Sequence, residues 1–258
     1  MSGDSLHLSE LRIVLLGYRG DGKSSSGNTI LGREEFDTVG RTAQSVKRQG
    51  QVAGRQVTVV EAPGWFINSQ LEETPELTKE EIGLSVSLCP PGPHALLLVI
   101  RVGYSFTETY KRPVQKHLEL LSESVWSHTI VLFTRGDWLG DTPIEQHIES
   151  EGESLQWLVE KCGNRYHVFN NQKREDHMQV TQLMEKIEEM VAGNRGHHYK
   201  IVLVYGTVNQ CGVWNRVPVW SVEPCTNVEC VGGVPLQLMY GLPCTAGGWQ
   251  SSRGAGTP

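Results

Sequence analysis

Short apolar runs recur along the chain, and each is separated from the next by a longer stretch in which polar and charged residues dominate. The runs consist mainly of aliphatic and β-branched residues without polar alternation, a pattern typical of strands buried on both faces of a mostly parallel sheet. They lie at residues 11–16, 55–62, 94–100, 128–134 and 166–169.

The stretches between these runs carry the spacing of amphipathic helices. Residues 109–125 and 142–163 combine charged residues with apolar ones at helical spacing, and Gly163 follows the second stretch as a stop signal. A further helix is predicted where one face is formed by Val180, Leu183, Met184, Ile187, Met190 and Val191. Strands that alternate with helices predict a three-layer α/β domain, which we place at residues 9–195.

Both ends of the chain differ from this central part. Residues 1–8 form a short N-terminal extension before the first apolar run. From residue 196 to residue 258 the helical spacing is lost, Gly and Pro are frequent, and acidic residues are few. A segment of this composition buries too little apolar surface to fold alone, so we expect the C-terminal tail to be largely disordered.

Composition and charge narrow the class of protein. The net charge of −6 and the lack of a long basic run argue against nucleic acid as a partner. The most apolar run, residues 94–102, is about half the roughly 20 residues of a membrane-spanning helix, so no integral membrane segment is expected. Because the first ten residues carry acids and resemble no signal peptide, we expect a cytoplasmic protein with reduced thiols.

The strongest chemical signal follows the first apolar run. Gly17, Gly22, Lys23 and Ser24 match the phosphate-loop pattern G-x-x-x-x-G-K-[ST] between a strand-like and a helix-like segment. Glycine lets such a loop turn its amides toward phosphate, Lys23 would neutralise the β- and γ-phosphates, and Ser24 would hold Mg²⁺. The residues predicted to contact nucleotide here are Gly20, Asp21, Gly22, Lys23, Ser24 and Ser25.

A carboxylate at the end of the fourth apolar run predicts which base is bound. The sequence "TRGD" at residues 134–137 places Asp137 at the C-terminal edge of the expected sheet. A carboxylate there can accept hydrogen bonds from N1–H and the 2-amino group of guanine, which adenine does not offer. Asp137 therefore favours GTP over ATP, with a simple loop aspartate as the alternative.

Taken together, these motifs resemble the immunity-associated GTPases, the GIMAP family with its AIG-type G domain. The motifs that carry the resemblance are "GDGKSSSGNTILG" (20–32), "RTAQSVKRQG" (41–50), "LCPPGPHALLLVI" (88–100), "TRGD" (134–137) and "RYHVFNNQ" (165–172). Because its prolines stiffen the entry to a buried strand, we expect most of the 88–100 segment to be architectural, and His94 has no expected catalytic role.

The resemblance implies a P-loop NTPase G domain with a mostly parallel six-stranded sheet, one antiparallel edge strand, and GTP or GDP bound with Mg²⁺. It implies that Arg135 and Asp137 flank the guanine and that Asn170 lies in the loop beside it. Phe169 is expected to anchor that loop in the core. For Asn171, contact with the base and a place in a plain turn are equal alternatives.

Two positions near the expected metal depart from the family pattern. Glu61 stands where the family has a Mg²⁺-binding aspartate, whereas the glycine whose amide senses the γ-phosphate in such GTPases is kept as Gly64. We expect Glu61 to hold Mg²⁺ through a water, with an affinity that its extra methylene weakens. Lys47 replaces a threonine that would cap Mg²⁺, and an ammonium cannot ligate a cation. Either Ser45 or Thr42 takes that role, or Lys47 touches phosphate directly.

A third departure concerns hydrolysis. Trp65 stands where GTPases of this general class keep a glutamine that orients the attacking water, and an indole offers only a donor N–H. We therefore expect at most slow hydrolysis of GTP to GDP and phosphate, with no catalytic side chain identified. Arg33, Arg41 and Arg48 are conceivable arginine fingers, but we favour solvated surface charges.

Two functions fit this sequence. The first is a GTP-dependent switch in which residues 34–70 meet a partner or a second copy, since the resemblance implies self-association through the switch regions. The apolar residues 64–67 are a candidate contact there, with packing against the first or third helix as the alternative. The second function is a degenerate G domain that no longer switches and serves as a protein-interaction module.

Overall fold

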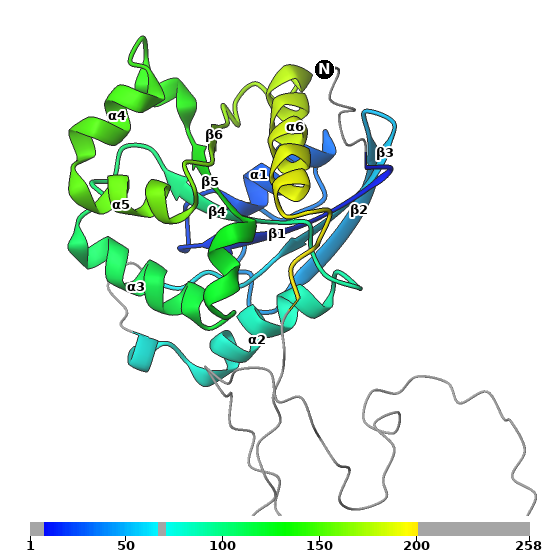
Figure 1. The fold of residues 1–258 in the computed structure, drawn as a ribbon, viewed down its shortest axis with the longest axis horizontal. Coiled ribbons are helices and arrows are strands. Elements are labelled where there is room, and N and C mark those ends of the chain that lie inside the picture. Colours follow the sequence, from blue (N-terminus) through cyan, green and yellow to red (C-terminus); the bar gives the residue numbers. More distant parts are fainter. Residues whose placement is uncertain (1–7, 67–70, 201–258) are drawn as a thin grey trace, which may run out of the picture. The chain divides into compact units, whose positions relative to one another are not determined.

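The computed structural model describes residues 8–66 and 71–200, which form a single sheet with helices on both faces (Figure 1). The strands are hydrogen-bonded in the order β2-β3-β1-β4-β5-β6, and only β2 runs antiparallel to its neighbour. They are β1 (Glu10–Gly17), β2 (Val46–Val52), β3 (Arg55–Glu61), β4 (Ala95–Arg101), β5 (Thr129–Thr134) and β6 (Tyr166–Val168). This arrangement confirms the predicted sheet. The predictions for residues 1–7 and 201–258 lie outside the described residues.

Helices connect the parallel strands. They are α1 (Lys23–Leu31), α2 (Glu76–Ser87), α3 (Glu108–Glu119), α4 (Ile144–Glu151), α5 (Glu153–Lys161) and α6 (His177–Gly193), with shorter 3-10 turns η1 (Leu71–Glu73), η2 (Glu123–His128) and η3 (Gly136–Leu139).

The prediction of one helix over residues 142–163 is wrong. Gly152 separates α4 from α5 with a φ of 89°, a conformation that favours glycine and interrupts a helix. The helix predicted over 109–125 ends earlier, at Glu119.

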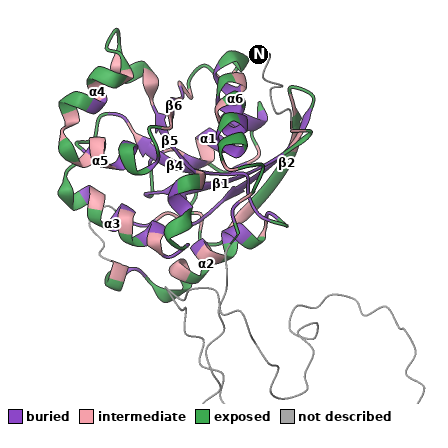
Figure 2. Ribbon diagram, in the orientation of Figure 1, coloured by how far each residue is buried: buried purple, intermediate pink, exposed green. Residues whose placement is uncertain are grey.

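Side chains from alternate positions of the sheet fill two separate cores. On β1, Val14 and Leu16 belong to the cluster that includes α2, α3 and α5, whereas Ile13 and Leu15 belong to the cluster that includes α1 and α6. Both sets are fully buried, and Figure 2 shows the central strands in the colour of buried residues. Burial on both faces explains why these strands appear in the sequence as continuous apolar runs.

The 88–100 segment is structural, as expected. The backbone N–H of Arg12 donates to Nδ1 of His94 (3.0 Å), and Nε of Arg12 donates to the carbonyl of Gly92 (2.7 Å). Burial lowers the pKa of His94 to about 4, so its ring is neutral and suited to accept a hydrogen bond. The backbone N–H of Tyr199 donates to the carbonyl of Pro93 (2.9 Å), and its side chain is fully buried. The chain therefore still packs against the domain four residues beyond residue 195.

A buried ion pair joins the sheet to helix α6. Nη2 of Arg55 lies 3.0 Å from Oε2 of Glu188, and the other carboxylate oxygen accepts from the backbone N–H of Leu8 (2.8 Å). Because removal of one buried partner leaves the other charge unpaired, Glu188→Gln should lower the free energy of unfolding by about 2 kcal/mol. Urea unfolding measures this loss. The exposed neighbour Glu189→Gln is the control, and equal effects of the two changes would contradict the assignment.

Candidate functional site

The loop between β1 and α1 has the backbone that a phosphate cradle requires. Gly20 and Gly22 adopt positive φ values of 89° and 96°, and Gly22 caps the N-terminus of α1. A Cβ added to Gly17 would lie 2.5 Å from the carbonyl oxygen of Val99, and one added to Gly22 would lie 3.2 Å from the side chain of Thr134. Glycine at these positions follows from conformation and close packing, which lets the loop hold its amides at the start of α1.

Lys23 is buried at the centre of this loop. Its ammonium donates to the carbonyls of Tyr18 (2.9 Å) and Gly17 (3.3 Å). Burial lowers the pKa of Lys23, and the carboxylates of Glu61 and Asp21 oppose that shift. A Cβ added to Gly64 would lie 2.5 Å from Nζ of Lys23. Lys23, the first residue of α1, therefore lies directly against Gly64, which follows β3.

Three side chains with oxygen atoms that can ligate a metal ion lie beside Lys23. Oε1 of Glu61 accepts hydrogen bonds from the hydroxyls of Ser24 (2.8 Å) and Thr42 (3.1 Å). Glu61 is only 3% exposed, and its burial raises the pKa of the carboxyl. Thr42 and Glu61 line a pocket of about 140 Å³. Hydroxyl and carboxylate oxygens are the ligands that Mg²⁺ takes in proteins, so this donor set fits the expected ion.

The three residues considered for the role of the missing threonine have different surroundings. Ser45 is bound to α2, because its N–H and hydroxyl donate to the carboxylate (2.8 Å) and the carbonyl (2.9 Å) of Glu81. Lys47 is exposed on β2 and pairs with Val60 of β3. Its side chain therefore lies on the opposite face of the sheet from that of Glu61. Thr42 alone of the three reaches Glu61.

The side chain of Asp21 is buried against α3. It is 1% exposed and accepts a hydrogen bond from the hydroxyl of Tyr110 in α3. Burial raises the pKa of Asp21 to about 6, although Tyr110 and Lys23 favour the charged form. The carbonyl of Asp21 accepts from the hydroxyl of Thr134 (2.6 Å) at the end of β5. Asp21 therefore holds the loop to α3 through its side chain and to β5 through its carbonyl.

The residues expected around the base lie at the ends of β5 and β6. Asp137 lies in the first turn of η3, and within the described part of the chain its carboxylate has no hydrogen bond or ion pair. The guanidinium of Arg135 lies 4.6 Å from the ring centre of Trp138, a cation–π contact. The N–H of Gly136 donates to the carbonyl of Phe169 (2.9 Å), and Phe169 is fully buried as expected. The two loops are therefore joined through their backbones.

The two asparagines after Phe169 have different roles. Oδ1 of Asn170 accepts from the backbone N–H of Gln172 (3.0 Å), which makes the turn of its own loop. Nδ2 of Asn171 donates to the hydroxyl of Thr29 (3.2 Å) in α1. Asn171 thereby links the loop after β6 to the helix that carries the phosphate loop, a contact that neither alternative for this residue had included.

Trp65 packs inside the protein. It is 1% exposed, and its indole stacks on the ring of His117 in α3 with centroids 4.5 Å apart and planes 9° apart. Burial lowers the pKa of His117 to about 4, so this ring is neutral. Packing against the third helix, the alternative for residues 64–67, therefore holds for Trp65. Phe66 is 46% exposed, and Ile67 lies outside the described residues.

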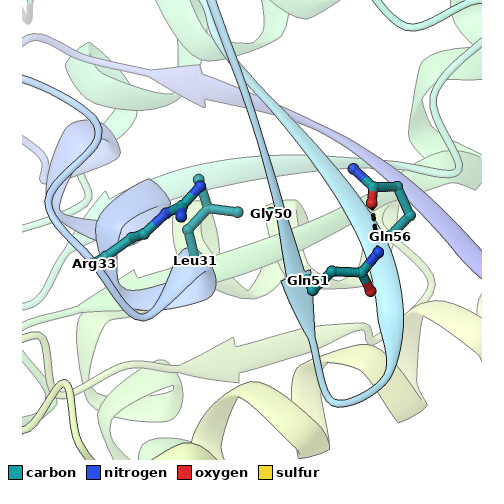
Figure 3. A pocket seen from close by; sticks show the side chains of 5 residues that line it. All are labelled: Leu31, Arg33, Gly50, Gln51 and Gln56. Atoms are coloured by element: carbon teal, nitrogen blue, oxygen red, sulfur yellow. Dashed lines mark hydrogen bonds between the residues drawn. The ribbon is translucent and has the colours of Figure 1, made fainter.

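A wider hollow lies away from this loop. It has a volume of about 410 Å³ and is lined by residues from the end of α1 and from the β2–β3 hairpin: Leu31, Arg33, Gly50, Gln51 and Gln56 (Figure 3). None of the residues expected to bind nucleotide lines it. Across residues 8–66 and 71–200, no helix has the length and hydropathy to cross a membrane, and no group of three His, Cys, Asp or Glu is placed to hold a metal.

The fold and the loop are those of a P-loop NTPase G domain. Toc33 from Arabidopsis thaliana has a similar structure, with a TM-score of 0.57 at 14% identity over 72% of this chain and 86% of that chain. Another structure of Toc33, in complex with GDP and Mg²⁺, gives 0.57 at 15% identity over 73% and 86%. At this identity the likeness concerns the fold.

The chain belongs to the AIG1 family, whose model matches residues 11–215. It is 34% identical over 197 residues to GTPase IMAP family member 8 of Homo sapiens, covering 74% of this chain and 28% of that relative. It is 33% identical over 199 residues to Immune-associated nucleotide-binding protein 9 of Arabidopsis thaliana, covering 72% and 57%. The resemblance inferred from the motifs is confirmed. The chain spans less than two thirds of the length of either relative.

Proposed function

We propose that this chain binds GTP and GDP together with Mg²⁺ and prefers them to ATP. Two groups of residues, linked through the end of β5, support the proposal. Lys23, Ser24 and Gly64 meet where phosphates bind in a P-loop fold, and Asp137 offers a free carboxylate at the end of β5. The hydroxyl of Thr134 links these two groups through the carbonyl of Asp21.

In this proposal the metal lies among the oxygens near Glu61. Ser24 would hold Mg²⁺ directly and Glu61 through a water, with Thr42 in place of the missing threonine. When bound, the ion neutralises phosphate charge. The backbone amides of residues 20–25 would hold the phosphates, while Arg135, Asn170 and Asn171 shape the loops around the base.

Hydrolysis in this proposal is slow. Trp65 is buried against His117 and carries no acceptor that could orient a water. The chain would therefore remain in its GTP-bound form long enough to act as a switch, in which residues 34–70 change with the nucleotide. For the chloroplast translocon components atToc33 and psToc159, dimerization is important for GTPase activity. We extend self-association to this chain, with the exposed Phe66 as part of the contact.

The alternative is a G domain that binds no triphosphate and serves as a docking module. Glu61 favours it, because its longer side chain already accepts from Ser24 and Thr42. Titration of the whole chain with fluorescent GTP, with Mg²⁺ and with EDTA, separates the two functions. Tight binding that weakens in EDTA supports the switch, whereas binding too weak to measure in both buffers supports the docking module.

A further inference from the structure

Arg19 lies in the phosphate loop beside the point where Lys23 and Gly64 meet. Its backbone N–H donates to the carbonyl of Trp65 (2.8 Å). A Cβ added to Gly64 would lie 2.8 Å from the backbone nitrogen of Arg19 and 3.0 Å from its Cα. Arg19 is therefore packed against the glycine whose amide is expected to sense the γ-phosphate.

The guanidinium of Arg19 is a charge without a carboxylate partner in the described part of the protein. It is exposed and lies 5.7 Å from the ring centre of Phe66. In contrast, Arg33 and Arg48 both pair with Glu35, at 2.8 and 3.7 Å. Arg33 and Arg48 therefore agree with the expectation of surface charges. The guanidinium of Arg19 remains available to bind an anion near the phosphate loop.

A second positive charge beside Lys23 would allow two side chains to bind the same phosphate group. Lys23 is buried and held by loop carbonyls, so its reach is fixed. An arginine on the surface of the loop can approach from outside, and its planar fork matches two oxygens of one phosphate. Gly64 lies against the ammonium of Lys23, and this is the point where the terminal phosphate of a triphosphate belongs.

We propose that Arg19 is a second cationic ligand of the terminal phosphate and makes the site prefer GTP to GDP. This inference rests on the proposed function. The backbone of Arg19 packs against Gly64, where the proposed function puts the γ-phosphate, and GDP has no phosphate there. The residue therefore adds affinity for the triphosphate and leaves the affinity for the diphosphate nearly unchanged.

The test compares GDP with the non-hydrolysable analogue GMPPNP, both with Mg²⁺, on the full chain. Loss of one charge-assisted contact predicts that Arg19→Ala weakens GMPPNP binding about tenfold and GDP binding less than about twofold. Arg19→Lys should fall between Arg19→Ala and the unchanged chain. Arg112→Ala, which removes an exposed arginine of α3, is the matched control and should change neither affinity.

Two results would overturn the inference. One is an equal loss for the two nucleotides in Arg19→Ala. The other is a selective loss of GMPPNP binding in Arg41→Ala but not in Arg19→Ala, because Arg41 lines the pocket next to Glu61. If the unchanged chain bound neither nucleotide, the proposed function would fail together with this inference. Tight binding of both nucleotides with either of the first two results refutes the role of Arg19 alone.

Discussion

Replacing Lys23 by alanine should weaken the binding of GTP and of GDP at least about 100-fold, which corresponds to roughly 3 kcal/mol. The ammonium is buried in the loop, 2.5 Å from a Cβ placed on Gly64, where phosphates would bring negative charge. A charge pair shielded from water is strong, and its loss leaves the phosphates without their central partner. Titration with a fluorescent guanine nucleotide measures the change.

The control for this experiment removes a lysine from the surface. Lys116 in α3 is 58% exposed and pairs with Glu119, so Lys116→Ala should leave affinity unchanged. Lys23→Ala also removes the donor to the carbonyls of Tyr18 and Gly17, so thermal unfolding is measured first and only a folded variant is compared. A folded Lys23→Ala variant with unchanged affinity would mean that nucleotide does not bind in this loop.

Replacing Asp137 by alanine should reduce the affinity for GTP about 100-fold and leave any affinity for ATP unchanged. The carboxylate is exposed in the first turn of η3 and has no partner among the described residues. Two hydrogen bonds from guanine to a charged acceptor are worth about 3 kcal/mol together, even at the low end for such bonds. Competition between GTP and ATP for the bound fluorescent nucleotide measures this selectivity.

Asp141, which is exposed four residues further along the same loop, provides the matched control. Asp141→Ala removes the same charge near the same turn and should keep the preference for GTP. If both aspartate variants lost affinity equally, a general electrostatic effect would explain the result. If Asp137→Ala kept the full preference, another group would have to recognise the base.

The sequence predicts the central strands well because strands buried on both faces appear in it as continuous apolar runs. Val14 and Ile13 point to opposite faces of the sheet, yet both are fully buried, so the sequence from Ile13 to Leu16 is continuously apolar. β2 (Val46–Val52) has no such apolar run, because it lies at the edge of the sheet and most of its polar residues are exposed. The six-stranded sheet followed from the family resemblance.

Side-chain direction is the part that the sequence leaves undetermined. Ser45 and Thr42 are equally able to hold a metal, and only the folded backbone brings Thr42 rather than Ser45 to Glu61. Trp65 is buried because His117, from a helix much later in the chain, lies opposite it. Arg19 occupies a variable position of the phosphate-loop pattern, so that pattern alone gave it no role.

The most direct test of the account is competition for the nucleotide site of the unchanged full chain. With Mg²⁺ present, a bound fluorescent guanine nucleotide should be displaced by GTP and by GDP at concentrations at least about 100-fold below those of ATP, since adenine lacks the two donors that Asp137 accepts. Displacement by ATP at the same concentration as GTP would contradict the guanine site. Failure to bind the fluorescent nucleotide at all would contradict nucleotide binding altogether.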